Sequence, residues 1–275
     1  MSGKESARYE RLDERDRKAA RSKRLTVTLA AGALTLTGVA ACGSDDDRGG
    51  ESKGTLTVLA ASSLTEAFGE LEQTFESEHD VDVKVSYDSS SVLADQVIEG
   101  APADVLATAD EQTMQSVVDE DLTDGDPQTF AQNSLVIVTP PDNPANIESL
   151  QDFTDDVTFA VCVPEAPCGD AAKRLLDLDK IDADPATEEE NVKDVLTKVT
   201  SGEVDAGLVY VSDAQAAGDD VATVQAENAS EVVNADPIAV LADAGDTELA
   251  QEWVDLVLGD EGQQVLKSYG FQPGA

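Results

Sequence analysis

Small polar residues stand at points where an apolar strand pattern gives way to a helical one. Ser63 follows the apolar run 55–60, and the serine tract 89–91 precedes a second predicted helix. The first turn of a helix exposes unpaired backbone N–H groups at the positive end of the helix dipole, so each junction can hold an anion. Ser63 with Glu66 also fits a capping box, so a single junction can equally be an ordinary helix cap.

Two similar junctions lie in the second half of the chain. Cys168 and Gly169 open a helix that is expected to begin near Asp170, and Asn191 precedes a helix that is expected to begin near Val192. If several of these junctions converge on one cleft, they would form an anion-binding site from uncharged donors.

Motifs for catalysis or for a resident cofactor are missing from the sequence. His79 is the only histidine and stands in the polar segment ESEHD, where a solvated side chain is expected rather than a catalytic base. The chain has no phosphate-binding glycine motif and no EF-hand pattern, and a zinc site would need more ligands of the right kind. We therefore expect a protein that is not an enzyme and has no cofactor. An exported enzyme that uses His79 or Asp88 is an alternative.

The cysteine pattern indicates an oxidising compartment. Cys162 and Cys168 stand close together, and Pro164 and Pro167 restrict the loop between them. We expect them to form a disulfide that stabilises the fold by roughly 2 kcal/mol. Two free buried thiols are the alternative.

The first 53 residues are predicted to lie outside the folded body. A basic stretch runs into the uncharged segment 25–41, which ends in small residues directly before Cys42. This layout is typical of a secretory signal, and the segment 39–42 resembles a bacterial lipobox. We expect a lipoprotein signal peptide over 1–41, a lipidated Cys42 that anchors the protein to the outer face of the cell membrane, and a flexible tether over 42–53. A short apolar anchor with an ordinary cysteine is the alternative.

The charge balance excludes one class of partner. The 275 residues include 18 Lys and Arg and 57 Asp and Glu, which gives a formal net charge of −39. No nucleic-acid partner is expected, because the chain lacks the basic surface that such binding needs. Most carboxylates are interpreted as a solvated surface, although an acid-rich protein that binds cations or acts in adhesion would show the same composition.

Strand and helix patterns alternate along the body of the chain. Apolar strands are expected near 55–60, 81–86, 103–109, 135–139, 157–162, 206–211 and 238–241. Amphipathic helices are expected after residue 64 and near 92–99, 111–118, 171–178, 192–199 and 247–258. This alternation predicts an α/β fold with mainly parallel sheets that are flanked by helices.

Five segments, in this order, resemble the molybdate-binding proteins of ABC importers. They are AASSLTEAF (60–68), YDSSSVLADQVIEGAPADVLATAD (87–110), NSLVIVTP (133–140), GLVYVSDA (207–214) and LKSYGFQP (266–273). The resemblance implies a two-lobed periplasmic-binding-protein fold of the class II type with a hinge between the lobes. Residues 54–133 and 236–275 would form lobe 1, and residues 134–235 would form lobe 2.

The same resemblance implies a set of oxyanion-binding residues. Ser63 and Ser90 would contribute hydroxyl and backbone N–H donors from lobe 1. Cys168 and Val192 would contribute backbone N–H groups from lobe 2, and Tyr210 would contribute its hydroxyl. Molybdenum would be held only as molybdate, through these residues.

Four positions modify this expectation. Ala109 matches a position that lines the family's cavity and is expected to contribute mainly shape. Cys168 replaces the family's alanine, so the disulfide would stiffen the donor loop. Asp88 and Asp170 stand beside the donors, and a carboxylate that faced the ligand would repel a dianion or accept a hydrogen bond from a protonated one.

The implied function is a monomeric extracytoplasmic receptor that binds molybdate or tungstate and delivers it to an ABC transporter permease. Molybdate carries no proton at neutral pH and needs donors only, whereas hydrogen phosphate favours a site with an acceptor. A receptor for sulfate, phosphate or another oxyanion is the alternative.

Overall fold

The computed structural model describes residues 54–154 and 156–274. The predicted signal peptide over 1–41, the predicted lipidation at Cys42 and the tether up to residue 53 lie outside the described residues. Within the part of the chain that the structure describes, no helix is long and apolar enough to cross a membrane.

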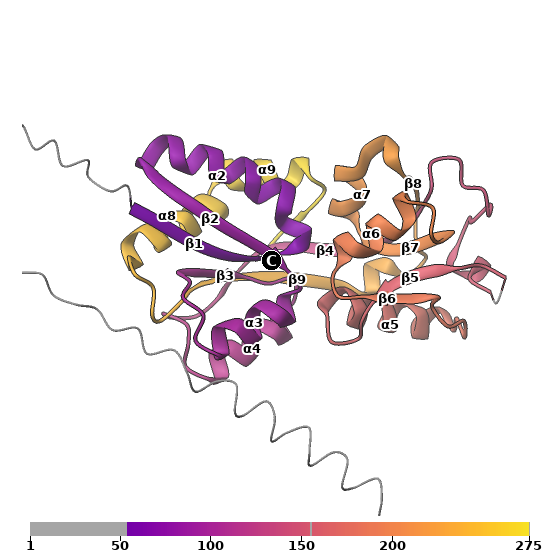
Figure 1. Ribbon diagram of the computed structural model, residues 1–275, viewed down its shortest axis with the longest axis horizontal. Helices are drawn as coiled ribbons and strands as arrows, with labels where there is room; N and C mark the ends of the chain where they lie inside the picture. Colours follow the sequence, from indigo (N-terminus) through magenta and orange to yellow (C-terminus); the bar gives the residue numbers. More distant parts are fainter. Residues whose placement is uncertain (1–53, 155, 275) are drawn as a thin grey trace, which may run out of the picture. The chain divides into compact units, whose positions relative to one another are not determined.

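The described strands follow one hydrogen-bonded path, in the order β2-β1-β3-β9-β4-β7-β5-β6 (Figure 1). β8 and β10 pair with different parts of β4. The strands are β1 (Gly54–Ala61), β2 (Val81–Asp88), β3 (Val105–Ala107), β4 (Gln128–Thr139), β5 (Phe159–Cys162), β6 (Thr187–Glu189), β7 (Ala206–Tyr210), β8 (Ala222–Val224), β9 (Val233–Val240) and β10 (Gln272–Pro273).

Helices connect most of these strands. They are α2 (Thr65–His79), α3 (Ser90–Ile98), α4 (Glu111–Asp119), α5 (Pro167–Asp179), α6 (Val192–Thr200), α7 (Val211–Ala217), α8 (Thr247–Leu258) and α9 (Asp260–Ser268). Short 3-10 turns are η1 (Ser62–Leu64), η2 (Leu150–Asp152), η3 (Gly218–Asp220) and η4 (Ala229–Glu231).

Both faces of the strands around β1 are covered by helices. On one face, Phe68 and Phe75 of α2 pack edge-on against Trp253 of α8, with ring centroids 5.6 and 5.4 Å apart. On the other face, Leu59 of β1 and Leu93 of α3 belong to a separate apolar cluster. Successive strand residues point to opposite faces, so burial on both sides explains the nearly unbroken apolar run of β1.

Two strands, β4 and β9, join the first strand group (β1, β2 and β3) to the second strand group (β5 to β8). β4 pairs antiparallel with β9 as far as Ser134 opposite Val233, and then pairs antiparallel with β7 from Leu135 opposite Tyr210. Figure 1 shows β4 and β9 running between the two groups. The cavity described below lies where these strands pass from one group to the other.

The predicted α/β class is confirmed, but the sheet is mixed instead of mainly parallel. β1 pairs in parallel with β2 and β3, and β5 pairs in parallel with β6 and β7, as strand-helix-strand units require. β9 pairs antiparallel with β3 and β4, and β4 pairs antiparallel with β7. The antiparallel pairs arise because β4 and β9 carry the chain between the groups in opposite directions.

Two boundaries differ from the predicted ones. α5 begins at Pro167 instead of near Asp170, because proline fits the first turn of a helix, where no backbone N–H is needed. β4 begins at Gln128 instead of residue 135. Its first part contains only two apolar residues, Phe130 and Ala131, and its pairing with β9 and β10 identifies it as a strand.

Candidate ligand-binding site

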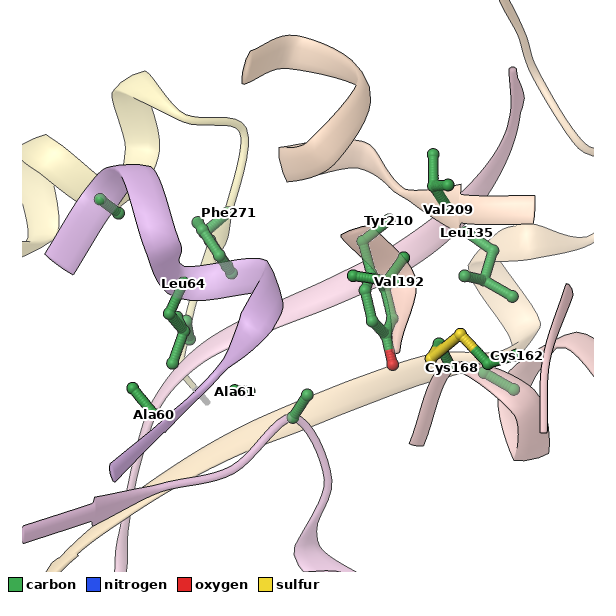
Figure 2. Close-up of a cluster of buried hydrophobic side chains, with 14 of the residues drawn as sticks. Ala60, Ala61, Leu64, Leu135, Cys162, Cys168, Val192, Val209, Tyr210 and Phe271 are labelled. Atoms are coloured by element: carbon green, nitrogen blue, oxygen red, sulfur yellow. A yellow bond between two sulfur atoms is a disulfide. The ribbon is translucent and has the colours of Figure 1, made fainter. Parts of the chain in front are cut away.

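A cavity lies among η1 and the N-terminal ends of α3, α5 and α6. It encloses about 210 Å³ of empty space, part of which is continuous with solvent. The cavity brings together the six positions that the sequence singled out, namely Ser63, Ser90, Ala109, Cys168, Val192 and Tyr210. Its lining is completed by Ala61, Ser62, Asp88, Ser89, Pro167 and Asn191. Figure 2 shows Val192, Tyr210 and Cys168 gathered near one another.

Two hydroxyl groups reach the cavity from the first strand group. Ser63 belongs to the turn η1 directly after β1, and its buried Oγ has no hydrogen-bond partner in the described part of the chain. Ser90 is the first residue of α3, and its Oγ accepts a hydrogen bond from the backbone N–H of Ala109 at 3.0 Å. Because its oxygen already accepts, the Ser90 hydroxyl keeps its own proton for another partner.

The N-terminus of α5 offers a backbone donor from the second strand group. Cys168 follows Pro167 at the start of this helix, where an N–H group has no acceptor within the helix. Cys168 forms the predicted disulfide with Cys162. The neighbouring Gly169 allows close packing, because a Cβ at this position would stand 1.9 Å from the Val163 carbonyl oxygen.

The N-terminus of α6 offers a second backbone donor. Asn191 caps this helix, and its Oδ1 accepts from the N–H groups of Lys193 and Asp194 at 3.0 and 3.2 Å. The N–H of Val192 receives no such cap. It therefore remains available at the positive end of the helix dipole.

Tyr210 ends β7 and is 2% exposed. Its hydroxyl oxygen accepts from Asn234 Nδ2 at 2.9 Å. Burial raises the pKa of Tyr210 well above its ordinary value, and negative charge on nearby acidic residues acts in the same direction. The phenol therefore stays protonated and can donate a hydrogen bond into the cavity.

The two carboxylates that the sequence left open have different positions. Asp88 lines the cavity, and its Oδ1 accepts from the backbone N–H of Ser89 at 2.7 Å. Asp170 lines a different cavity, where its Oδ2 lies 2.8 Å from Nε of Arg174. Only Asp88 can therefore place negative charge at the candidate site.

An ion-pair cluster beside the cavity joins the two strand groups. Lys193 Nζ lies 2.7 Å from Glu66 Oε2 of α2 and 3.0 Å from Asp213 Oδ1 of α7. Burial lowers the pKa of Lys193, but the charges of Asp213 and Glu66 outweigh this effect and leave the pKa above its ordinary value. The ammonium group is therefore charged and holds α2 against α6.

Sequence reasoning missed Asn234 and Asp236, which lie on β9 close to this site. Asn234 bonds to Tyr210, and both carboxylate oxygens of the fully buried Asp236 have no hydrogen-bond partner among the described residues. No local motif marks either residue, because their partners are distant in the sequence. Ala109 also does more than shape the cavity, since its N–H holds Ser90 Oγ.

Residues 56–272 match the model of a protein family described as bacterial extracellular solute-binding proteins. The chain belongs to this family. Its members are solute-binding receptors, which confirms the prediction that the protein is not an enzyme.

Known relatives of this solute-binding protein agree with the predicted resemblance. The molybdate-binding protein ModA of Mycobacterium tuberculosis is 39% identical, over 87% of this chain and 94% of ModA. The periplasmic molybdate-binding protein of Azotobacter vinelandii has the same fold, with a TM-score of 0.71 and 19% identity over 80% of this chain and 100% of that chain.

A relative named for another anion has the fold as well. The sulfate-binding protein SubI of Mycobacterium tuberculosis matches with a TM-score of 0.70 and 18% identity, over 80% of this chain and 87% of that chain. These likenesses confirm the predicted periplasmic-binding-protein fold. The fold alone does not separate the two anions.

Proposed function

We propose that this protein is an extracytoplasmic receptor that binds molybdate, and also tungstate, in the cavity between its two strand groups. The observation that carries the proposal is the convergence of uncharged donors from four separate helix or turn starts and one strand end. The donors are the hydroxyls of Ser63, Ser90 and Tyr210 and the backbone N–H groups of Cys168 and Val192.

These donors are sufficient to hold a dianion in a strongly acidic protein. A hydrogen bond to a charged group contributes about 1.5 to 3 kcal/mol, so five of them contribute roughly 8 to 15 kcal/mol before desolvation and ordering costs. Solvent and salt screen the distant carboxylates over about 8 to 10 Å, whereas the donors act at contact distance. Binding in the micromolar to nanomolar range is therefore within reach.

Molybdate is proposed as the ligand in preference to sulfate because of the sequence relationship. The 39% identity to a molybdate-binding protein extends over most of both chains, whereas the likeness to the sulfate-binding protein concerns the fold alone. The donors require an anion without protons, and molybdate, tungstate and sulfate all meet this requirement at neutral pH.

Capture is proposed to involve closure of two lobes about β4 and β9. We assign residues 54–133 and 236–275 to lobe 1 and residues 134–235 to lobe 2, so that the donors come from both. The ion pair between Lys193 and Glu66 spans the two lobes and supports the closed form. Closure would exclude water from the anion and strengthen each hydrogen bond.

Delivery is proposed to occur at the membrane surface. A lipid on Cys42 and the tether that follows would keep the receptor beside an ABC transporter permease, which would open the lobes and release the anion. We expect the receptor to act as a monomer. The support for this anchor is the lipobox-like sequence before Cys42.

Calorimetric titration of the mature protein with molybdate, tungstate, sulfate and phosphate tests the ligand. We expect Tyr210→Phe and Ser63→Ala together to weaken molybdate binding at least tenfold, since each removes a donor. Tyr87→Phe is the matched control, because the Tyr87 hydroxyl is buried and unpartnered but does not line the cavity.

Different outcomes separate the candidate functions. Unchanged affinity in the double variant would show that the donor set is wrong. Tight sulfate binding without molybdate binding would identify a sulfate receptor. Calcium-dependent stability with no response to oxyanions would instead indicate an acidic cation-binding protein.

A further inference from the structure

Asn234 lies on β9 at the point where β4 passes from one strand group to the other. It pairs with Asn133 of β4 and is 4% exposed. Its side chain contacts both strand groups, because Nδ2 lies 3.0 Å from the Ala109 carbonyl oxygen and 3.4 Å from the Pro167 carbonyl oxygen. Asn234 is therefore a buried polar link directly behind the cavity.

Arg174 and the two carbonyl oxygens together determine which way the Asn234 amide faces. The guanidinium Nη2 of Arg174 donates to Asn234 Oδ1 at 2.7 Å, and Asp170 holds the same guanidinium through Nε at 2.8 Å. A guanidinium group can only donate, so the amide oxygen must face Arg174 and the amide NH₂ must face the cavity side. The orientation thus follows from chemistry as well as from the coordinates.

The oriented NH₂ group determines where the Tyr210 hydroxyl proton points. Asn234 Nδ2 donates to the Tyr210 hydroxyl oxygen at 2.9 Å. A phenol has one proton, and an oxygen that accepts from Asn234 directs this proton elsewhere. The proton is therefore free for a ligand in the cavity that Tyr210 lines.

The same amide reaches a second hydroxyl through the peptide groups of Ala109. Asn234 donates to the Ala109 carbonyl oxygen, and the Ala109 N–H donates to Ser90 Oγ. Ser90 is thereby also held as an acceptor on its protein side, with its proton available to the ligand. Asn234 directs the Tyr210 hydroxyl itself, whereas Ser90 is directed by the Ala109 N–H, and Asn234 contacts only the carbonyl of that residue.

We propose that Asn234 is a positioning residue that makes this site selective for oxyanions without protons. With the amide in place, Tyr210 and Ser90 present protons, and the backbone groups of Cys168 and Val192 can only donate. None of these four groups can accept the O–H of hydrogen phosphate, so this O–H would have to turn to another group of the lining, such as the Asp88 carboxylate. The proposal rests on the oxyanion function proposed above, and it deepens that function by assigning its selectivity to Asn234.

Asn234→Asp reverses the chemistry without changing the size of the side chain. The carboxylate accepts where the amide donated, so the Tyr210 proton turns toward residue 234 and the phenol presents a lone pair to the cavity. Titration calorimetry at fixed pH with molybdate, sulfate and phosphate measures the effect. We expect the molybdate-to-phosphate affinity ratio to fall about a hundredfold or more, with the molybdate-to-sulfate ratio unchanged, because neither of these two anions carries a proton.

Asn133→Asp is the matched control. Asn133 is equally buried and adjacent on β4, but its Nδ2 bonds to Ser212 instead of Tyr210. We expect this variant to keep the wild-type molybdate-to-phosphate ratio. If Asn234→Asp weakens all three anions equally, or if Asn133→Asp changes the ratio as much, Asn234 does not determine selectivity.

A second variant covers the case in which Asn234→Asp does not fold. Arg174 has a side chain that is 46% exposed, so Arg174→Met should fold while it removes one of the groups that orient the amide. We expect the molybdate-to-phosphate ratio to fall about threefold to tenfold, and Lys173→Met, at an exposed position of the same helix, to leave it unchanged. An unchanged ratio in Arg174→Met would contradict the proposal. If the wild-type protein binds none of the three anions, the proposed function itself fails.

Discussion

Replacement of Asp236 by Asn is expected to stabilise the protein increasingly as the pH rises. Asp236 lies on β9, is fully buried, and has no hydrogen-bond partner for either oxygen within the described residues. Burial raises its pKa well above the ordinary value, and the negative charges of Asp110 and Asp213 add to the effect. The native protein therefore keeps this carboxyl group neutral, while the unfolded chain ionises it.

The sign and size of the effect follow from proton linkage. Above the ordinary aspartate pKa of about 3.9, the native state binds one proton more than the unfolded state at this position. The free energy of unfolding then falls by about 1.4 kcal/mol for each pH unit until the native pKa is reached. The contribution of Asp236 is complete below about pH 4 and is lost as the pH rises, so the asparagine variant gains relative to the wild type in that window.

Urea unfolding at constant salt, from pH 4 to pH 8, measures this difference. The two proteins should have similar stability near pH 4, and the variant should gain about 1.4 kcal/mol over the wild type for each further pH unit until the native pKa is reached. Asp219→Asn removes a charge at an exposed position and controls for the change in net charge. A constant difference in stability across this pH range would refute a neutral Asp236.

Three further changes test the cavity and its closure. Asp88→Asn should tighten molybdate binding about fivefold, because a like charge at contact distance costs about 1 kcal/mol even in water. An unchanged dissociation constant at low salt would show that this carboxylate faces away from the anion. Gly169→Ala should destabilise the fold by about 3 kcal/mol in urea unfolding, because the new Cβ would collide with the Val163 carbonyl. Wild-type stability in this variant would contradict the close packing of α5. Glu66→Gln should speed molybdate release about threefold in stopped-flow measurements, because it weakens the ion pair with Lys193. A change in the association rate alone would count against a role of this ion pair in closure.

Local sequence patterns placed four of the candidate donors at helix or turn starts, and the resemblance to molybdate-binding proteins assigned them the role of oxyanion donors. Ser63, Ser90, Cys168 and Val192 stand where a strand or loop gives way to a helix start, and the geometry of a first helical turn exposes N–H groups wherever it occurs. The resemblance of the Tyr210 motif to molybdate-binding proteins added the phenol. The disulfide between Cys162 and Cys168 was also predictable, since both residues lie in one short loop.

The tertiary structure alone decided how these donors are held. Asn234 meets Arg174 across 60 residues and Tyr210 across 24, and Lys193 meets Glu66 across 127. The polar part of β4 and the antiparallel pairs of β9 likewise depend on partners that no local pattern names. Neighbouring residues determine where a helix starts and where its free N–H groups lie. The direction of a buried hydroxyl depends instead on the distant group that the fold places against it.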